Sequence, residues 1–311
     1  MKSVRENLRK ISPFNNRQDM STSWYVAKKL VAFIAIYIMA AVIGEGIIIG
    51  IHYAMGYDPL HGIMPMGKWA DLVPYYGMIL FLFMTMLYCK FVEKRSIKSM
   101  GINGKITDYI LGGLLAIVLL AIIIGSCLVT NVLSYSGINS NIDVKYILAL
   151  LIGIVIQGAA EEVLCRGFVM NSLLLKKISV PVAILASGTA FTLPHLMKIM
   201  DADFIYVVIA IVNLYLVSAV FSLLALCRVN IWIACGLHSV WNFILMGMLG
   251  LTLSGNEAET SGIFIFNTES LNIINGGSYG IEAGIATTLV LGVTVLILIK
   301  ILRKRRNVYG V

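Results

Sequence analysis

The most informative residues of this chain for chemistry are charged groups inside segments that are otherwise apolar. Glu161, Glu162 and Arg166 lie within one apolar segment of membrane length. Each charged residue near the centre of a membrane helix costs roughly 2.5–3.5 kcal/mol on insertion scales, unless it pairs or lines a polar cavity. Two later apolar segments contribute His195 and His238. Carboxylates and imidazoles are the groups that general acid–base hydrolysis uses, so a hydrolytic site is our first hypothesis.

The spacing within the first of these segments separates the two carboxylates. Glu162 and Arg166 are four residues apart, so on a helix they share one face and can form an ion pair. Glu161 points about a quarter-turn away, and Gln157 lies one turn before it on the same face. We interpret Glu162–Arg166 as a structural ion pair and Glu161 as the carboxylate left free for chemistry.

His195 directly follows Pro194, and proline interrupts a helix because it lacks a backbone donor. A kink beside His195 is therefore expected. If the fourth and fifth apolar segments form an antiparallel hairpin with its tip near Ile178, Glu161 and His195 lie equally far from that tip. We predict that these two side chains can meet.

The third polar pair is His238 and Asn242, which are four residues apart and face one way on a helix. Counted from Arg228, His238 lies roughly 15 Å into its segment, which is shallower than the level expected for Glu161. The mismatch shrinks if the fourth segment, which is longer than a bilayer is thick, protrudes into the cytoplasm. On this interpretation one carboxylate, two imidazoles and an amide converge on one cavity.

The composition places these residues in a membrane protein. The 311-residue chain is 59% hydrophobic and 13% charged, with a mean hydropathy of +0.89, which is too apolar for a soluble domain. Helices are the expected spanning elements, because lipid leaves backbone polar groups without partners. The expected fold class is therefore all-α, a polytopic transmembrane helix bundle. We expect about eight spans, at 28–51, 72–91, 107–133, 146–175, 181–198, 204–227, 231–253 and 281–302.

The distribution of basic residues predicts the topology. With the N-terminus inside, nearly all Lys and Arg residues fall on inner segments. This predicts that both termini are cytoplasmic. Residues 1–29 lack the pattern of a cleaved signal peptide. We divide the chain into a basic cytoplasmic segment at 1–27, a single transmembrane bundle at 28–302 and a basic cytoplasmic tail at 303–311.

Several other features have plain interpretations. The net charge of +8 fits topology signals better than nucleic-acid binding, so no nucleic-acid partner is expected. The five cysteines are scattered without CxxC spacing, so we interpret them as small hydrophobic residues, with Cys165 alone near the predicted chemistry.

Glu45 and Asn213 are two more polar residues in apolar segments. We expect Glu45 to be structural or to line a cavity.

In chain order, the three polar segments read Glu161-Glu162-xxx-Arg166, Phe191-xxx-His195 and His238-xxx-Asn242. They resemble the EExxxR, FxxxH and HxxxN signatures of the CPBP family of intramembrane endopeptidases. That family contains type II CAAX prenyl proteases and the bacteriocin-processing or bacteriocin-immunity (Abi) proteins. Every signature position matches, and the resemblance covers a core of about residues 145–250.

The resemblance implies peptide-bond hydrolysis within the membrane by a glutamate-activated water. Carried onto this chain, it implies that Glu161 is the general base and that His195 holds or polarises the water. His238 and Asn242 would stabilise the oxyanion. The supporting residues would be Glu162, Arg166 and Phe191. The resemblance also implies a peptide or membrane-anchored protein as substrate, and we expect an integral protein of a bacterial plasma membrane.

A metal site is the alternative chemistry. Glu161, His195 and His238 could supply three ligands with an open fourth position, which is the arrangement of a catalytic zinc site. The chain has no HExxH motif on one helix. We therefore expect a glutamate mechanism that requires no cofactor, with zinc at these three residues as the other option.

Two other function classes fit the same residues. A non-catalytic membrane scaffold or bacteriocin-immunity protein of the same fold would use the polar cluster for packing alone. A proton-coupled transporter would use buried Glu and His as a relay, but the sequence has no paired inverted repeats. Substitution of Glu161 separates these classes, because a scaffold keeps its phenotype where a peptidase loses cleavage.

Overall fold

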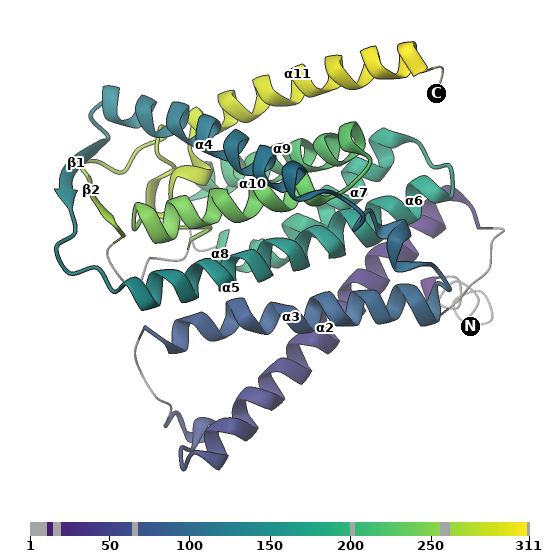
Figure 1. The fold of residues 1–311 in the computed structure, drawn as a ribbon, viewed down its shortest axis with the longest axis horizontal. Helices are drawn as coiled ribbons and strands as arrows, with labels where there is room; N and C mark the ends of the chain where they lie inside the picture. The colour runs from purple at the N-terminus through teal and green to yellow at the C-terminus, as the bar shows by residue number, and fades with distance from the viewer. Residues whose placement is uncertain (1–10, 15–19, 64–67, 200–202, 256–261, 310–311) are drawn as a thin grey trace.

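Helices account for nearly all of the regular structure in the computed structural model (Figure 1). Residues 11–14, 20–63, 68–199, 203–255 and 262–309 are described. The α-helices and strands are α2 (Thr22–Ala54), α3 (Val73–Leu87), α4 (Ile106–Val129), β1 (Leu133–Ile138), α5 (Val144–Glu162), α6 (Asn171–Leu175), α7 (Val180–Thr192), α8 (Leu196–Ile199), α9 (Phe204–Arg228), α10 (Trp232–Phe243), β2 (Phe264–Thr268) and α11 (Ile285–Tyr309).

The helices match the predicted membrane spans. Six are long and apolar enough to cross a bilayer, and two shorter apolar helices lie at Val180–His195 and Trp232–Met248. Each of the eight predicted segments therefore contains a helix, which confirms the all-α membrane bundle, and the protein is an integral membrane protein. The start of α2 and the end of α11 lie at the same end of the molecule (Figure 1), as an even number of crossings requires. Their cytoplasmic location stays a prediction, as do the domain boundaries.

The two shorter helices are shortened for local reasons. The α7 helix ends at Thr192, and a tight 3₁₀ turn at Leu193–His195 follows it, where Pro194 cannot continue the helix. The predicted interruption beside His195 is therefore present. The segment predicted at 231–253 is helical only as far as Met248, and Gly250 then takes a φ of +60° that glycine tolerates best.

The structure corrects the sequence analysis at one end of the bundle. Strands β1 and β2 pair antiparallel, with Leu133 opposite Thr268, whereas we expected residue 133 at the end of a span and residue 268 in the connection between the spans at 231–253 and 281–302. The α4 helix ends at Val129, four residues before β1. A two-stranded pair between distant segments has no local signature, because each strand is too short to show a clear alternation.

The α5 helix, which carries the two adjacent glutamates, begins at a well-defined cap. The Asp143 carboxylate accepts a hydrogen bond from the Tyr146 backbone N–H at 3.1 Å, which satisfies one of the free donors at a helix start. Lys68 donates to the same carboxylate at 2.6 Å. This hydrogen bond holds the pKa of Asp143 below its usual range.

The α10 helix lies at the centre of the bundle and packs on α4, α5 and α9. On the outer side of α5 lies α3, and both α7 and α11 pack on α9. The α2 helix crosses α3, and its C-terminal half diverges from the other helices (Figure 1). Glu45 lies on this half and is exposed, so it does not belong to the bundle core.

Two glycines allow α4 and α10 to approach closely. A Cβ atom on Gly112 would lie 2.0 Å from the Ile233 carbonyl oxygen, and one on Gly236 would lie 1.9 Å from the Tyr109 carbonyl oxygen. Both distances are far below van der Waals contact, and backbone atoms cannot move aside as a side chain can. Glycine at these positions therefore sets the position of α10, the helix that carries His238.

We predict that Gly236→Ala destabilises the protein, because the added methyl group forces α10 away from α4. Overpacking of this kind costs about 1–3 kcal/mol. Thermal unfolding of the purified protein in detergent should show a lower midpoint. Gly46→Ala is the matched control, since a Cβ there meets nothing within 4 Å, and it should melt like the wild type. Equal midpoints for the two variants would contradict the packing argument.

Candidate active site

The end of α5 places two adjacent carboxylates in different surroundings. The Glu162 side chain is fully buried, and its Oε1 accepts hydrogen bonds from Arg166 Nη1 at 2.8 Å and from His238 Nδ1 at 3.0 Å. The Glu161 side chain is 17% exposed and lines a cavity. Its Oε1 accepts a hydrogen bond from Gln157 Nε2 at 3.2 Å. One carboxylate is therefore bound by an arginine and a histidine, while its neighbour faces the cavity.

Arg166 joins three helices at the centre of the site. Its Nη2 donates to the backbone oxygen of Ser218 at 3.1 Å and to the Ser218 hydroxyl at 2.6 Å. The guanidinium group lies 4.9 Å from the ring centroids of both Phe191 and Phe221, within the range of a cation–π contact. Phe191 thus contacts the arginine of the first motif. Ser218 and Phe221, both on α9, are partners that the sequence analysis missed.

His238 meets both glutamates. Its Nδ1 bonds Glu162, its Nε2 lies 3.8 Å from Glu161 Oε2, and its ring stacks on Phe221 at 5.0 Å. The structure corrects the expected difference in depth between His238 and Glu161. The helical segment Val144–Leu175 has 32 residues and is about 48 Å long, against a bilayer core of about 30 Å. For a helix this long, the number of residues between Glu161 and the neighbouring loop does not give the depth of Glu161 in the bilayer.

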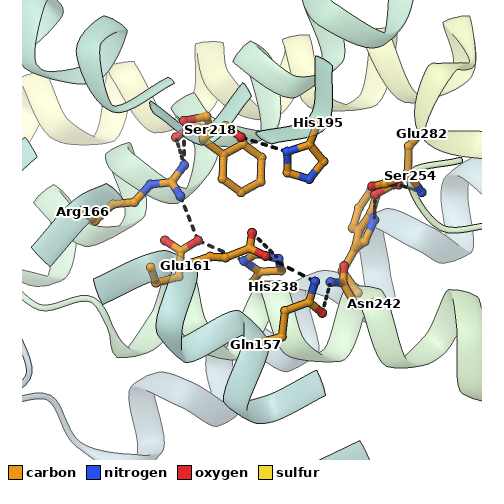
Figure 2. Close-up of polar contacts among 12 residues, drawn as sticks. Gln157, Glu161, Arg166, His195, Ser218, His238, Asn242, Ser254 and Glu282 are labelled. Carbon is orange, nitrogen blue, oxygen red and sulfur yellow. Dashed lines mark hydrogen bonds and ion pairs between the residues drawn. The ribbon is translucent and has the colours of Figure 1, made fainter. Parts of the chain in front are cut away.

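His195 reaches the same cavity from the 3₁₀ turn after α7. Its Nδ1 donates to the Phe191 backbone oxygen at 2.9 Å, because a carbonyl can only accept. In the neutral ring this leaves Nε2 as an acceptor for a water or a substrate. His195 and Glu161 both line the cavity (Figure 2). They share this space without a direct hydrogen bond between them among the described contacts.

Asn242 extends the polar row on the other side of Glu161. Its Nδ2 donates to Gln157 Oε1 at 3.4 Å, and Gln157 in turn donates to Glu161 (Figure 2). Asn242 and His238 both line the cavity, so the i, i+4 spacing does turn both side chains the same way. The amide of Asn242 is thus presented beside the free carboxylate.

The cavity has a volume of about 470 Å³, within the usual range for small-molecule sites. The polar lining residues of the three sequence motifs come from α5, α10 and the turn after α7. Helices α2 and α3 supply an apolar and aromatic wall that includes Phe33, Tyr37 and Tyr75. The arrangement can hold a water between a carboxylate and an imidazole, next to an apolar surface for a peptide.

Comparison with known proteins gives one match. A family model described as type II CAAX prenyl endopeptidase, Rce1-like, matches residues 143–244. Over residues 143–244, which we call the Rce1-like segment, the chain is similar to this endopeptidase family. The match covers about a third of the chain and contains all the predicted site residues, which confirms the resemblance seen in the three motifs. At the level of the family it supports a CAAX-type intramembrane protease. Comparisons with curated proteins and with solved structures gave no match.

The Rce1-like segment does not gather a metal site. Glu161, His195 and His238 do not form a group close enough to hold a metal ion, and neither does any other set of three His, Cys, Asp or Glu side chains in the described ranges. The zinc option is therefore not supported by the geometry, and we derive no step through a metal.

The structure also places the cysteines, Asn213 and Glu45, which the sequence analysis named. Cys165 lines the cavity of the Rce1-like segment, and all five cysteines are unpaired and buried. Asn213 donates to the backbone oxygens of Glu282 and Gly284 at 2.8 and 3.0 Å, so it fixes the chain before α11. Glu45 is exposed on α2 and is absent from the lining of the described cavity.

The sequence analysis missed the acidic residues Asp71 and Glu282 of the cavity lining. Glu282 lies just before α11, outside the Rce1-like segment, and it lines the cavity together with Ser254 and Trp241. Its carboxylate accepts hydrogen bonds from both of these residues. The signal that led to Glu161, a charge at an apolar segment, was present at Glu282 as well.

We predict that Arg166→Leu strongly destabilises the protein, because it leaves the fully buried Glu162 without its cation. Removing one partner of a buried ion pair typically costs about 3–5 kcal/mol. The double variant Glu162→Leu/Arg166→Leu should recover part of this loss, since no unpaired charge remains. The free energies of unfolding of both variants test the pair. A double variant that is less stable than the single one would contradict this account.

Proposed function

We propose that this protein is an intramembrane endopeptidase that hydrolyses a peptide bond of a peptide or membrane-anchored protein. The observation that carries the proposal is the convergence of Glu161, His195, His238 and Asn242 on one cavity inside a membrane bundle (Figure 2). Each residue comes from an element within the Rce1-like segment. A plasma-membrane location in a bacterium is part of the proposal.

In the proposed reaction, a water lies between Glu161 and the Nε2 of His195. The Glu161 carboxylate removes one proton as the water oxygen attacks the carbonyl carbon, so a C–O bond forms and the carbonyl oxygen becomes an oxyanion. The C–N bond then breaks, and Glu161 returns its proton to the leaving amine. The products are a carboxylic acid and an amine, and no oxidant, reductant or cofactor is needed.

His238 and Asn242 are the proposed donors to the oxyanion. His238 can donate from Nε2 only when both ring nitrogens are protonated, because Nδ1–H is already directed at Glu162. Fixed donors of this kind contribute most to catalysis where water is scarce.

Glu162 and Arg166 support these roles by position. Glu162 bonds both Arg166 and His238 through one oxygen, so it fixes the orientation of the imidazole. Because Glu161 is the adjacent residue on α5, the same contact holds its backbone against α10. Neither Glu162 nor Arg166 is required to take part in proton transfer.

We predict that Glu161→Gln and His195→Ala each abolish cleavage of the natural substrate. Removal of a general acid–base group lowers rates by about 10²–10⁴-fold. Comparative proteomics of cells that express the wild type or Glu161→Gln should reveal an uncut membrane peptide or protein. Glu45→Gln is the matched control, because Glu45 is exposed and lies away from the cavity, and it should process the substrate normally.

The same experiment separates the proposal from a scaffold of the same fold. A scaffold needs the packing of the bundle but not the proton chemistry of Glu161. If both active-site variants fold and retain the cellular phenotype and the same peptide profile as the wild type, the peptidase proposal fails and the scaffold function is favoured.

A further inference from the structure

Glu282 joins three parts of the chain at the wall of the cavity. Its Oε1 accepts a hydrogen bond from the indole N–H of Trp241 at 3.1 Å. Its Oε2 accepts from the backbone N–H and from the hydroxyl of Ser254, both at 2.7 Å. Glu282 lies in a 3₁₀ turn at Ile281–Ala283 that is itself fixed by Asn213 on α9. The carboxylate is therefore a rigid anchor for the other two groups.

The two groups that Glu282 holds are next to the proposed chemistry. Trp241 is 3% exposed and directly precedes Asn242 on α10. Ser254 lies in the irregular segment that follows α10 and its π-helical extension. Trp241, Ser254, Glu282 and Asn242 all line the cavity. Figure 2 shows Ser254 and Glu282 together, on the same side of the site as Asn242.

Ser254 has an unfavourable backbone conformation. Its φ of +49° lies in the left-handed region, which is energetically costly for a residue with a side chain. The two hydrogen bonds to Glu282 offset that cost. We expect the backbone of Ser254 to relax toward an ordinary conformation when these bonds are lost, which would shift the wall of the cavity.

We propose that Glu282 is a positioning residue, which holds Trp241 and Ser254 as the cavity wall beside Asn242 and so determines where a peptide is seated. This inference rests on the proposed peptidase function. The position requires a carboxylate, because both of its oxygens accept. A glutamine has one acceptor oxygen and one donor nitrogen, so it must turn an N–H group toward either the indole or the Ser254 donors.

The native Cys165 provides a test that needs no substrate. It lines the same cavity, so its rate of alkylation by iodoacetamide reports access through the wall. We expect Glu282→Gln to raise this rate about tenfold, the shift that corresponds to one hydrogen bond to a charged group. Site-resolved mass spectrometry of the full-length protein in detergent measures it. The buried Cys127 on α4, outside the cavity lining, is the internal reference, and Glu45→Gln is the control variant.

Three results are informative. A rise at Cys165 alone, reproduced in part by Ser254→Ala, supports the positioning role. An unchanged rate at Cys165 overturns it, because the wall then does not depend on Glu282. A parallel rise at Cys165 and Cys127 also overturns it, since Glu282 would then stabilise the whole fold. None of these outcomes involves cleavage, so they are separate from the test of Glu161.

Discussion

The buried contact among Glu162, Arg166 and His238 is the constraint on which the rest of the site depends. An unpaired charge in this environment would cost several kcal/mol, so α5 with its π-helical extension and α10 must meet in an arrangement that pairs all three groups. The rings of Phe191 and Phe221 lie against the guanidinium group. Once Glu162 is held in this way, helical geometry turns Glu161 toward the cavity.

The backbone around this contact is adapted to it. Gly112 and Gly236 let α4 and α10 approach almost backbone to backbone. Two π-helical stretches, Val163–Met170 and Ile244–Met248, begin directly after Glu162 and two residues after Asn242. Such stretches are rare and are frequently found at functional sites. Glu162 and Asn242 therefore lie close to the points where the regular α-helix ends, and the helices around them pack closely.

The residues that line the cavity come from two parts of the chain, one inside and one outside the segment of the family match. The polar groups proposed for hydrolysis all come from residues 143–244, the segment that matches the Rce1-like family. The apolar wall from α2 and α3 and the carboxylate of Glu282 come from outside that segment. A family scaffold can in this way keep one reaction while the flanking helices define which peptide fits. We therefore expect substrate selection to reside in the parts of the chain that the family match does not cover.

The sequence by itself determined the features that follow from local periodicity and local chemistry. Apolar length predicted the helices, Pro194 predicted the interruption before His195, and the i, i+4 spacing predicted the Glu162–Arg166 pair. The β1–β2 pairing, the Ser218 and Phe221 contacts and the meeting of His238 with Glu161 were decided only by the tertiary structure. Each of these joins residues far apart in the chain, and no repeating pattern marks such partners. Their distances depend on how long helices tilt and extend beyond the bilayer, which counting residues from a loop cannot give.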